Sequence, residues 1–301
     1  MCKKDNHNDS DGSKYVLVKD NLHVRYTEEY IGNKEATTKQ TFLFVHGFMG
    51  CLETWSSVIN ELKLKAKSPD SFRILALDLI GCGRSSRPID WPYTFQDQGE
   101  VVFSFIEDLA LTNLVLVGHS AGAISIAHAA AKSGSKEQIS KLVFIAPGFF
   151  PHFKPPAFLS YWIFKPLITS MAKSFLSKRM EKLQEQHLNK ESLTPQMTGA
   201  FEAMVEMPNA LEILVANFRQ PPIDSPTILL SIKGLCPVHT IWGEGDTFYP
   251  PLMQEKIDEV LNDKTATISS TSTSEVVSNT GHYVQHEQPA TVARVILSLI
   301  E

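Results

Sequence analysis

The sequence predicts an α/β protein, with a mostly parallel twisted sheet flanked by helices on both faces and with an α-helical insertion. Short apolar segments of strand length alternate with helical patterns in the first half of the chain. The alternation stops after Pro147 and returns at Val238, and only helix-like segments lie between them. The chain has 301 residues, 43% of them hydrophobic and 20% charged, which suits one large α/β domain that carries an insertion.

The N-terminal region is expected to be a polar tail followed by a β-hairpin. Residues 1–13 are polar and rich in Gly, Ser and Asp, so we expect them to be disordered. Two apolar segments, 15–18 and 22–26, flank Asp20 and Asn21, and this pattern is typical of two paired strands joined by a turn.

The following segments complete the first part of the core, 14–147. Runs rich in β-branched and apolar residues predict strands, and apolar residues spaced three and four apart predict helices that cover them. The strands are expected at 41–45, 72–77, 114–118 and 142–145, and the helices at about 53–66, 97–111 and 121–131.

Residues 148–236 are predicted to form a helical cap, inserted between two core strands. Prolines separate its helix-like segments, which we place at 157–165, 167–183, 198–207 and 209–218. The second part of the core, 237–301, then holds a strand at 238–242, a helix near 251–261, an extended segment near 275–278 and a last helix at about 288–300.

Gly118-His119-Ser120-Ala121-Gly122 is the strongest functional signal in the chain. This G-x-S-x-G pattern follows a predicted buried strand and opens a predicted helix, which is the context of a nucleophilic serine on a sharp turn. Glycines on both sides leave room for a strained backbone at Ser120. The N–H that follows the serine, together with the helix N-terminus, would face a developing oxyanion.

A nucleophilic serine needs a base, and the base needs an acid that holds its tautomer. His282 lies in a glycine-hinged loop before the last helix, and Asp246 follows the strand that resumes the core. The chain order Ser120, Asp246, His282 is that of α/β sheets carrying this turn, and all three residues follow strand ends, where sites collect. Asp224 and Glu244 are the alternative acids. The remaining candidate histidines, which we interpret as structural or surface residues, are His46, His119, His128 and His286.

The second half of an oxyanion hole is expected after the third strand, in His46-Gly47-Phe48-Met49-Gly50. A turn there would direct the Phe48 N–H into the site, where it would act with the Ala121 N–H. The glycine-rich loop that follows Asp78 fits neither a dinucleotide-binding nor a Walker A pattern. We therefore expect Asp78 to accept hydrogen bonds from nearby backbone N–H groups, and we expect no nucleotide site.

Charge and cysteine content narrow the classes of function. The net charge of −5 and the sequence pI near 6.1 do not favour nucleic acid as a partner. The four cysteines show no metal-like spacing, so we expect no metal, no other cofactor and a reducing compartment. Without a visible signal peptide or a long apolar segment, we expect a cytoplasmic protein with no transmembrane segment. The oligomeric state is left open.

The predicted cap is apolar for a surface element, which favours a lipophilic small-molecule substrate. Methionine and aromatic side chains adapt to irregular apolar ligands, although most of these side chains would pack within the cap itself. An alternative use of the cap is peripheral contact with an anionic membrane surface through its basic side chains. These are Lys154, Lys165, Lys173, Lys178 and Arg179.

Taken together, these motifs resemble the α/β-hydrolase superfamily, and specifically its capped serine-hydrolase branch, which includes esterases and lipases. The resemblance covers about 14–147 and 237–301, and it also includes Gly281-His282 followed by Glu287-Gln288-Pro289. It implies Ser120 as nucleophile, His282 as base, Asp246 as orienting acid, and Phe48 and Ala121 as oxyanion donors. Ser120 separates the chain from similar dehalogenase and epoxide hydrolase branches, which use aspartate at that position. Ala123 departs from the pattern, since many relatives carry a second glycine there.

The expected activity is hydrolysis of a carboxylic ester with a substantial apolar portion, without a cofactor. Two alternatives remain open at this point. One is C–C bond hydrolysis or a lyase reaction at the same three residues. The other is a small-molecule receptor that keeps the hydrolase fold.

Overall fold

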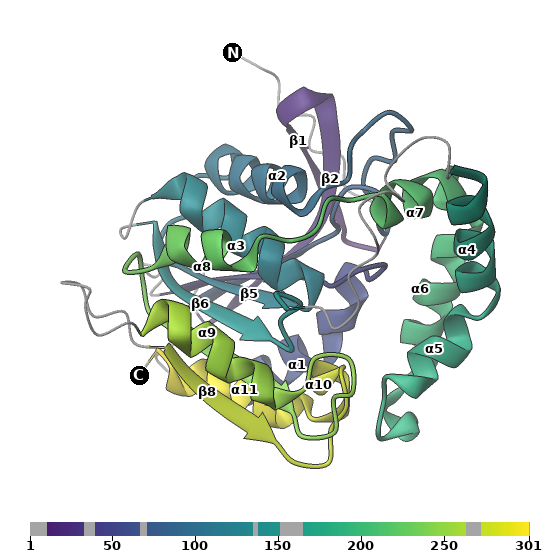
Figure 1. Ribbon diagram of the computed structural model, residues 1–301. Coiled ribbons are helices and arrows are strands. Elements are labelled where there is room, and N and C mark those ends of the chain that lie inside the picture. The colour runs from purple at the N-terminus through teal and green to yellow at the C-terminus, as the bar shows by residue number, and fades with distance from the viewer. Residues whose placement is uncertain are drawn as a thin grey trace.

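The computed structural model describes residues 11–32, 40–66, 71–134, 138–150, 165–262 and 272–300. Its centre is an eight-stranded sheet in the order β1-β2-β4-β3-β5-β6-β7-β8 (Figure 1). β2 is antiparallel to both of its neighbours, and all other pairs are parallel. The strands are β1 Lys14–Val18, β2 Leu22–Ile31, β3 Gln40–Val45, β4 Phe72–Leu77, β5 Leu114–His119, β6 Ile139–Ile145, β7 Val238–Gly243 and β8 Ser272–Val277.

Helices cover both faces of the sheet, as Figure 1 shows. One face carries α2 Phe95–Asp108, α3 Ala121–Ser133, α8 Ser225–Ile232 and α9 Gln254–Leu261. The other face carries α1 Ser56–Lys65, the short helix α10 Val284–Glu287 and α11 Pro289–Ser298. The described residues also form the short 3-10 helices η1 Lys19–Asn21, η2 Leu52–Trp55, η5 Lys190–Ser192 and η6 Pro251–Met253.

The central strands are mostly apolar because they are largely buried on both faces. In β3, the side chains of Leu43 and Val45 pack into the core beneath α2 and α3. Phe42 and Phe44, which alternate with them, pack into the second core, where Phe44 meets Trp55 at a ring distance of 5.0 Å. This alternation is the two-residue period of a strand, with a helix layer against each face.

The inserted helices α4 Lys165–Ser177, α5 Arg179–Glu185, α6 Pro195–Glu206 and α7 Ala210–Phe218 lie together beside the sheet, in the green part of Figure 1. α4 packs against α7, and their small apolar core, with Ile168, Ala172 and Leu214, reaches Met49 of the loop after β3. The four inserted helices α4–α7, here called the cap, therefore contact the loop expected to hold an oxyanion donor.

The hairpin and the alternating strands and helices are confirmed, with bounds shifted by a few residues. The segment predicted as one helix over 167–183 forms two helices, with a break at Lys178. The break was not predicted because no glycine or proline marks it. α8 was not predicted. Asp224 caps α8, and the helix packs against α3 and α9 of the core, although it belongs to the segment 148–236 predicted as the cap. The domain boundaries themselves stay predictions.

Two residues of the predicted tail are held in place. The Asp11 carboxylate pairs with Arg25 at 3.2 Å and with Arg84 at 2.7 Å, and the buried Ser13 Oγ accepts a 2.9 Å hydrogen bond from Arg25 Nε. Residues 1–10 and the cap segment 151–164, which includes Lys154, lie outside the described residues.

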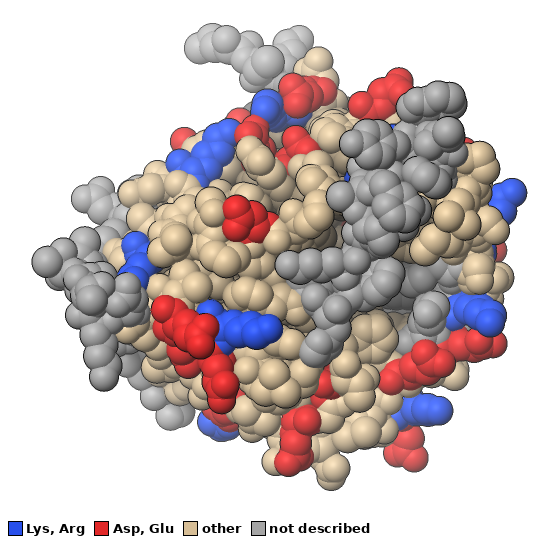
Figure 2. Space-filling view, in the orientation of Figure 1, with Lys and Arg blue, Asp and Glu red and all other residues tan. Residues whose placement is uncertain are grey.

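No helix within the described ranges has both the length and the apolar character needed to cross a membrane. On the face drawn in Figure 2, acidic and basic side chains of the described residues are interspersed over a largely uncharged surface.

Candidate active site

Ser120 occupies a strained turn between β5 and α3. Its φ of 52° and ψ of −115° lie in a region that L-residues rarely adopt. The turn is fixed by backbone hydrogen bonds: the Ser120 N–H donates to the Ile145 carbonyl at 2.9 Å, and the Gly148 N–H donates to the Ser120 carbonyl at 3.2 Å. The residue, which is 8% exposed, is thus held at the carboxyl end of β5.

The two glycines of the motif are required by close backbone contacts. A Cβ at Gly118 would lie 2.7 Å from the Ala123 nitrogen, and a Cβ at Gly122 would lie 2.4 Å from the His46 carbonyl oxygen. These distances are shorter than any ordinary contact, so a side chain at either position would push α3 away from β5 or from the loop after β3. The glycines therefore allow the sharp turn that presents Ser120.

His282 and Asp246 meet beside this turn. His282 Nδ1 donates to Asp246 Oδ2 at 2.8 Å, and both side chains are buried. The other carboxylate oxygen, Oδ1, accepts from the backbone N–H groups of Phe248 at 2.8 Å and Tyr249 at 3.0 Å. Asp246 is therefore fixed by three hydrogen bonds, and the imidazole carries its proton on Nδ1, which leaves Nε2 as the basic nitrogen.

The imidazole of His282 lies next to the residue that precedes the serine. The rings of His119 and His282 are 4.8 Å apart, and His119 Nε2 donates to the His282 carbonyl at 3.0 Å. No hydrogen bond joins Ser120 to His282 among the described residues. Such bonds between a nucleophile and its base often tighten only when substrate is bound.

The two alternative acids lie elsewhere. Asp224 accepts hydrogen bonds from Thr227 and caps the N-terminus of α8. Glu244 accepts from the backbone N–H of Asn279 at 3.3 Å and is exposed. Neither makes a contact with the imidazole, so the geometry favours Asp246 as the acid.

The loop after β3 approaches Ser120 closely. A Cβ at Gly47 would lie 3.1 Å from Ser120 Cβ and 2.9 Å from His119 Nδ1. The next residue is Phe48, whose ring stacks on Phe218 of the cap at 6.3 Å. Ala121 is the first residue of α3, so its N–H has no partner within the helix. Both backbone groups predicted for the oxyanion hole thus flank the serine.

Buried polar side chains hold this loop in place. His46 Nε2 accepts from the Leu79 N–H at 3.0 Å, while Nδ1 donates to the Gly47 carbonyl at 2.8 Å. Asp78 accepts from the Leu52 N–H at 2.7 Å and from the Arg84 N–H at 3.0 Å, so its predicted role is confirmed. Burial lowers the pKa of His46, which keeps the ring neutral in this structural role.

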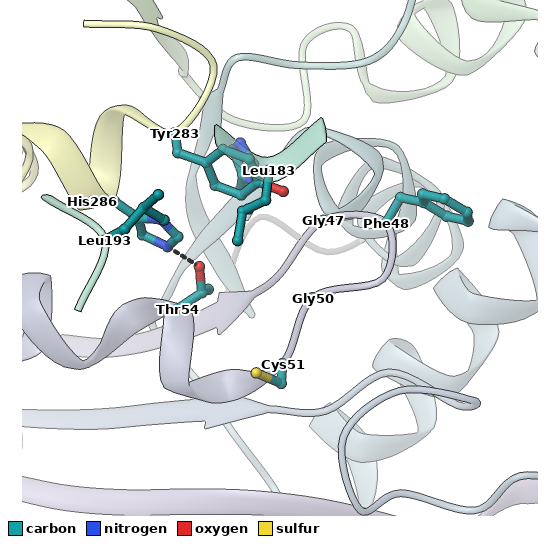
Figure 3. Close-up of a pocket in the computed structure, with 10 residues that line it drawn as sticks. Gly47, Phe48, Gly50, Cys51, Thr54, Leu183, Leu193, Tyr283 and His286 are labelled. Carbon is teal, nitrogen blue, oxygen red and sulfur yellow. Dashed lines mark hydrogen bonds between the residues drawn. The ribbon is translucent and has the colours of Figure 1, made fainter. Parts of the chain in front are cut away.

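The cap contributes a buried histidine that the sequence did not reveal. His187 Nδ1 bonds the Leu183 carbonyl at 2.7 Å, and its Nε2 lies 3.0 Å from His286 Nδ1. His286 Nε2 in turn bonds Thr54 Oγ1, the dashed line in Figure 3. Because the Leu183 carbonyl can only accept, this series of hydrogen bonds has one direction when both imidazoles are neutral. Thr54 donates to His286, His286 donates to His187, and His187 donates to Leu183.

Further contacts join the cap to the loop that carries His282. The ring of His187 stacks on Tyr283 at 4.6 Å and 6°, and the His282 N–H donates to the Gln186 carbonyl at 2.9 Å. The buried Glu287 carboxylate accepts from the Gly281 N–H at 2.8 Å and from the Asn189 N–H at 2.6 Å. The position of the imidazole thus depends on the cap as well as on the sheet.

Two pockets flank Gly47 and Phe48. The first, here called the Ala121 pocket, is mostly apolar and is lined by Leu79, Ile80, Tyr93, Phe95, Ala121 and Ile213. The second, here called the Tyr283 pocket, is drawn in Figure 3 and is lined by Gly47, Cys51, Thr54, Leu183, Tyr283 and His286, together with His119. Each pocket has one wall from the cap, Ile213 in the first and Leu183 in the second.

Sequence reasoning named Gly47, Phe48, His119 and His286, which line the second pocket, but it assigned no role to Tyr283, Leu183 or the neighbouring His187. Tyr283 follows His282 directly, so its place in the chain was an available signal. His187 and Leu183 had none, because helical periodicity does not show which distant segment a cap residue will meet. In the described part of the chain, no group of three or more His, Cys, Asp or Glu side chains could hold a metal ion.

The chain matches the family model for the α/β hydrolase fold over residues 40–289. Among curated proteins, it is 31% identical over 151 residues to a probable lysophospholipase, BODYGUARD 4, of Arabidopsis thaliana. That match covers 50% of this chain and 33% of the plant protein, so the chain spans about a third of that relative's length. It is also 26% identical over 268 residues to the uncharacterized hydrolase YugF of Bacillus subtilis, covering 87% of this chain and 90% of YugF.

Among solved structures, the fold is similar to that of a thermophilic esterase from Thermogutta terrifontis. The TM-score is 0.69 and the sequence identity is 19%, with 96% of this chain and 97% of the esterase covered. At that identity the likeness concerns the fold, which includes the eight-stranded sheet.

Proposed function

Because the chain belongs to the α/β-hydrolase family of enzymes, we propose that it is a serine hydrolase that cleaves a carboxylic ester with a substantial apolar portion through an acyl-enzyme intermediate. One observation carries the proposal: the 2.8 Å hydrogen bond between His282 and Asp246, formed beside the strained turn at Ser120. A binding protein would need neither a strained serine nor an acid behind a histidine. A serine hydrolase of this kind uses both.

In the proposed reaction, Ser120 Oγ attacks the ester carbonyl carbon while His282 Nε2 takes the hydroxyl proton. The N–H groups of Phe48 and Ala121 donate to the carbonyl oxygen as it becomes an oxyanion. The bond to the alcohol oxygen then breaks, and His282 returns the proton to the leaving alcohol. The acyl group remains on Ser120.

Water completes the cycle. His282 takes a proton from a water molecule, whose oxygen attacks the acyl carbon, and the tetrahedral intermediate releases the carboxylic acid and restores the Ser120 hydroxyl. Asp246 is not protonated in these steps. It holds the imidazole in the Nδ1–H tautomer and stabilises the imidazolium that forms twice in each turnover.

The Ala121 pocket supports an apolar acyl group. Its polar members are already bonded within the protein: the Gln98 amide makes two hydrogen bonds to the backbone of Ile80, and Asn217 Nδ2 donates to the Ile213 carbonyl at 2.9 Å. An apolar chain would therefore leave no polar group of this pocket without a partner. The names of the plant relative and of the bacterial esterase, which both describe ester hydrolases, point in the same direction.

Labelling with a fluorophosphonate probe tests the nucleophile, and mass spectrometry identifies the modified residue. We expect the adduct on Ser120 and loss of more than 99% of the turnover of p-nitrophenyl butyrate in Ser120→Ala, about the effect of removing a triad serine. A series of p-nitrophenyl esters with longer acids then measures the acyl preference.

Full turnover by a folded Ser120→Ala variant would falsify the proposal. Negligible turnover of every ester, combined with strong thermal stabilisation by a small ligand, would instead favour a receptor that keeps the hydrolase fold.

A further inference from the structure

The Tyr283 hydroxyl has no hydrogen-bond partner among the described residues, although only 8% of the residue is exposed. Its ring is held between His187 and His119, with ring distances of 4.6 and 5.0 Å. Figure 3 shows the hydroxyl oxygen directed into the pocket, toward the segment at Gly47. Burial raises the pKa of Tyr283 well above its ordinary value, so the hydroxyl keeps its proton and can donate.

An acceptor lines the same pocket. His119 Nε2 must carry a proton because it bonds the His282 carbonyl at 3.0 Å, and burial keeps the ring neutral by lowering its pKa. Nδ1 is therefore a bare lone pair, and it has no partner in the described part of the chain. Thr54 and His286, the other polar side chains at this wall, are bonded to each other.

The position of this pocket relative to His282 indicates which part of a substrate it receives. The imidazole must reach the leaving oxygen to protonate it, so the alcohol portion lies on the imidazole side of the serine. Tyr283 and His119 both lie next to the imidazole of His282, with ring distances of 5.5 and 4.8 Å. The Ala121 pocket lies on the other side of Gly47 and Phe48, and is left for the acyl chain.

We propose that the Tyr283 pocket binds the alcohol portion of the ester, and that the Tyr283 hydroxyl and His119 Nδ1 together select an alcohol that carries a second hydroxyl group. A hydroxyl both accepts and donates, so it can accept from Tyr283 and donate to His119 at once. The substrate class is then a monoester of an apolar acid with a diol or polyol. This inference rests on the proposed ester hydrolysis.

Three esters of one fatty acid test the two contacts separately: the 2-hydroxyethyl, 2-methoxyethyl and propyl esters. The hydroxyl can use both contacts, the ether oxygen can only accept from Tyr283, and the propyl group can use neither. We expect kcat/KM to fall in that order. In Tyr283→Phe, the ratio of kcat/KM for the hydroxyethyl ester to that for the propyl ester should drop about fivefold to tenfold, the usual effect of one neutral hydrogen bond.

Comparing ratios between enzyme variants removes the intrinsic reactivity of the three esters. Tyr30→Phe is the matched control, because Tyr30 lies on β2, exposed, and is bonded to Glu28. Its ratio should equal that of the wild type. Thermal unfolding of each variant confirms that it is folded.

A ratio in folded Tyr283→Phe that stays within twofold of the wild type overturns the inference, and so does a wild type that turns over all three esters equally. In either case Ser120 would still be labelled and the esters still cleaved, which leaves the proposed function standing. If Ser120 is not labelled and no ester is cleaved, the proposed function fails and this inference fails with it.

Discussion

His282 Nδ1 and Asp246 Oδ2 are 2.8 Å apart, and the aspartate is held in turn by the backbone N–H groups of Phe248 and Tyr249. The carboxylate therefore cannot rotate without losing three hydrogen bonds. This fixed pair determines which imidazole nitrogen faces the serine, and the first prediction follows from it.

Asp246→Asn should lower kcat for p-nitrophenyl butyrate by about 10³-fold to 10⁴-fold, because the amide can donate to Nδ1 and so favours the wrong tautomer. Steady-state kinetics measure the loss. Asp224→Asn is the matched control: it alters the cap of α8 and should leave kcat close to that of the wild type. Similar activity in the two variants would mean that Asp246 does not orient the base.

Gly47→Ala should reduce kcat/KM by about 10²-fold, the typical effect of losing one oxyanion donor. The new Cβ would lie 2.9 Å from His119 Nδ1 and 3.1 Å from Ser120 Cβ, so the loop must move away from the serine. Gly199→Ala provides the control, since nothing lies within 4 Å of the Cβ at that position of α6. If Gly47→Ala is fully active, the loop does not supply the donor.

Stability should depend on pH through the buried histidines. Burial lowers the pKa of His187 from 6.5 to about 4, so between these values the unfolded chain binds more protons than the folded protein. The contribution of His187 to the free energy of unfolding is therefore fully present above about pH 6.5. It falls toward pH 4, by up to about 1.4 kcal/mol per pH unit for one histidine.

His187→Phe keeps the aromatic stack on Tyr283 but cannot take up a proton. Urea unfolding at pH 7.5, 6.5 and 5.5 should show a lower stability than the wild type at pH 7.5, by about 1–3 kcal/mol, because the His286 N–H loses its acceptor. The stability of the variant should then decline less steeply with acid. Parallel pH profiles for the two proteins would contradict this account.

Ile213→Phe should shift the acyl preference toward shorter acids. Ile213 extends from the cap into the Ala121 pocket, and a larger ring there reduces the space for the end of the chain. We expect kcat/KM for the longest ester to fall about tenfold relative to that for the butyrate. A change of this size is within the range by which a methylene group alters kcat/KM in a hydrophobic pocket. Leu230→Phe, at an exposed site on α8, should keep the wild-type profile. An unchanged profile in Ile213→Phe would show that the acyl group does not bind in this pocket.

The core of the fold could be predicted because its signals are local. Leu43 and Val45, for example, belong to a short apolar segment whose length and aromatic and β-branched content favour a strand buried on both faces. The meeting of Asp246 with His282 was predictable too, because both follow strand ends and parallel strands bring those ends to one edge. Their catalytic roles stay predictions.

The cap contacts could not be predicted for a different reason. His187 meets His286, and Leu183 lines a pocket with Tyr283, but such pairings depend on how α5 lies against the core. Helical periodicity shows that a residue faces inward without showing what it faces. The break between α4 and α5 was missed for a similar reason, since the apolar pattern continues through it.

The amide protons of Gly281 and Asn189 share one acceptor, the Glu287 carboxylate. Neither segment can separate from the other without leaving part of a buried negative charge unsolvated, so the two segments open as one cooperative unit. In hydrogen–deuterium exchange these two amides should therefore lose protection together. In the proposed hydrolase, the loop that carries His282 would therefore be in position only while the segment at Asn189 is in position.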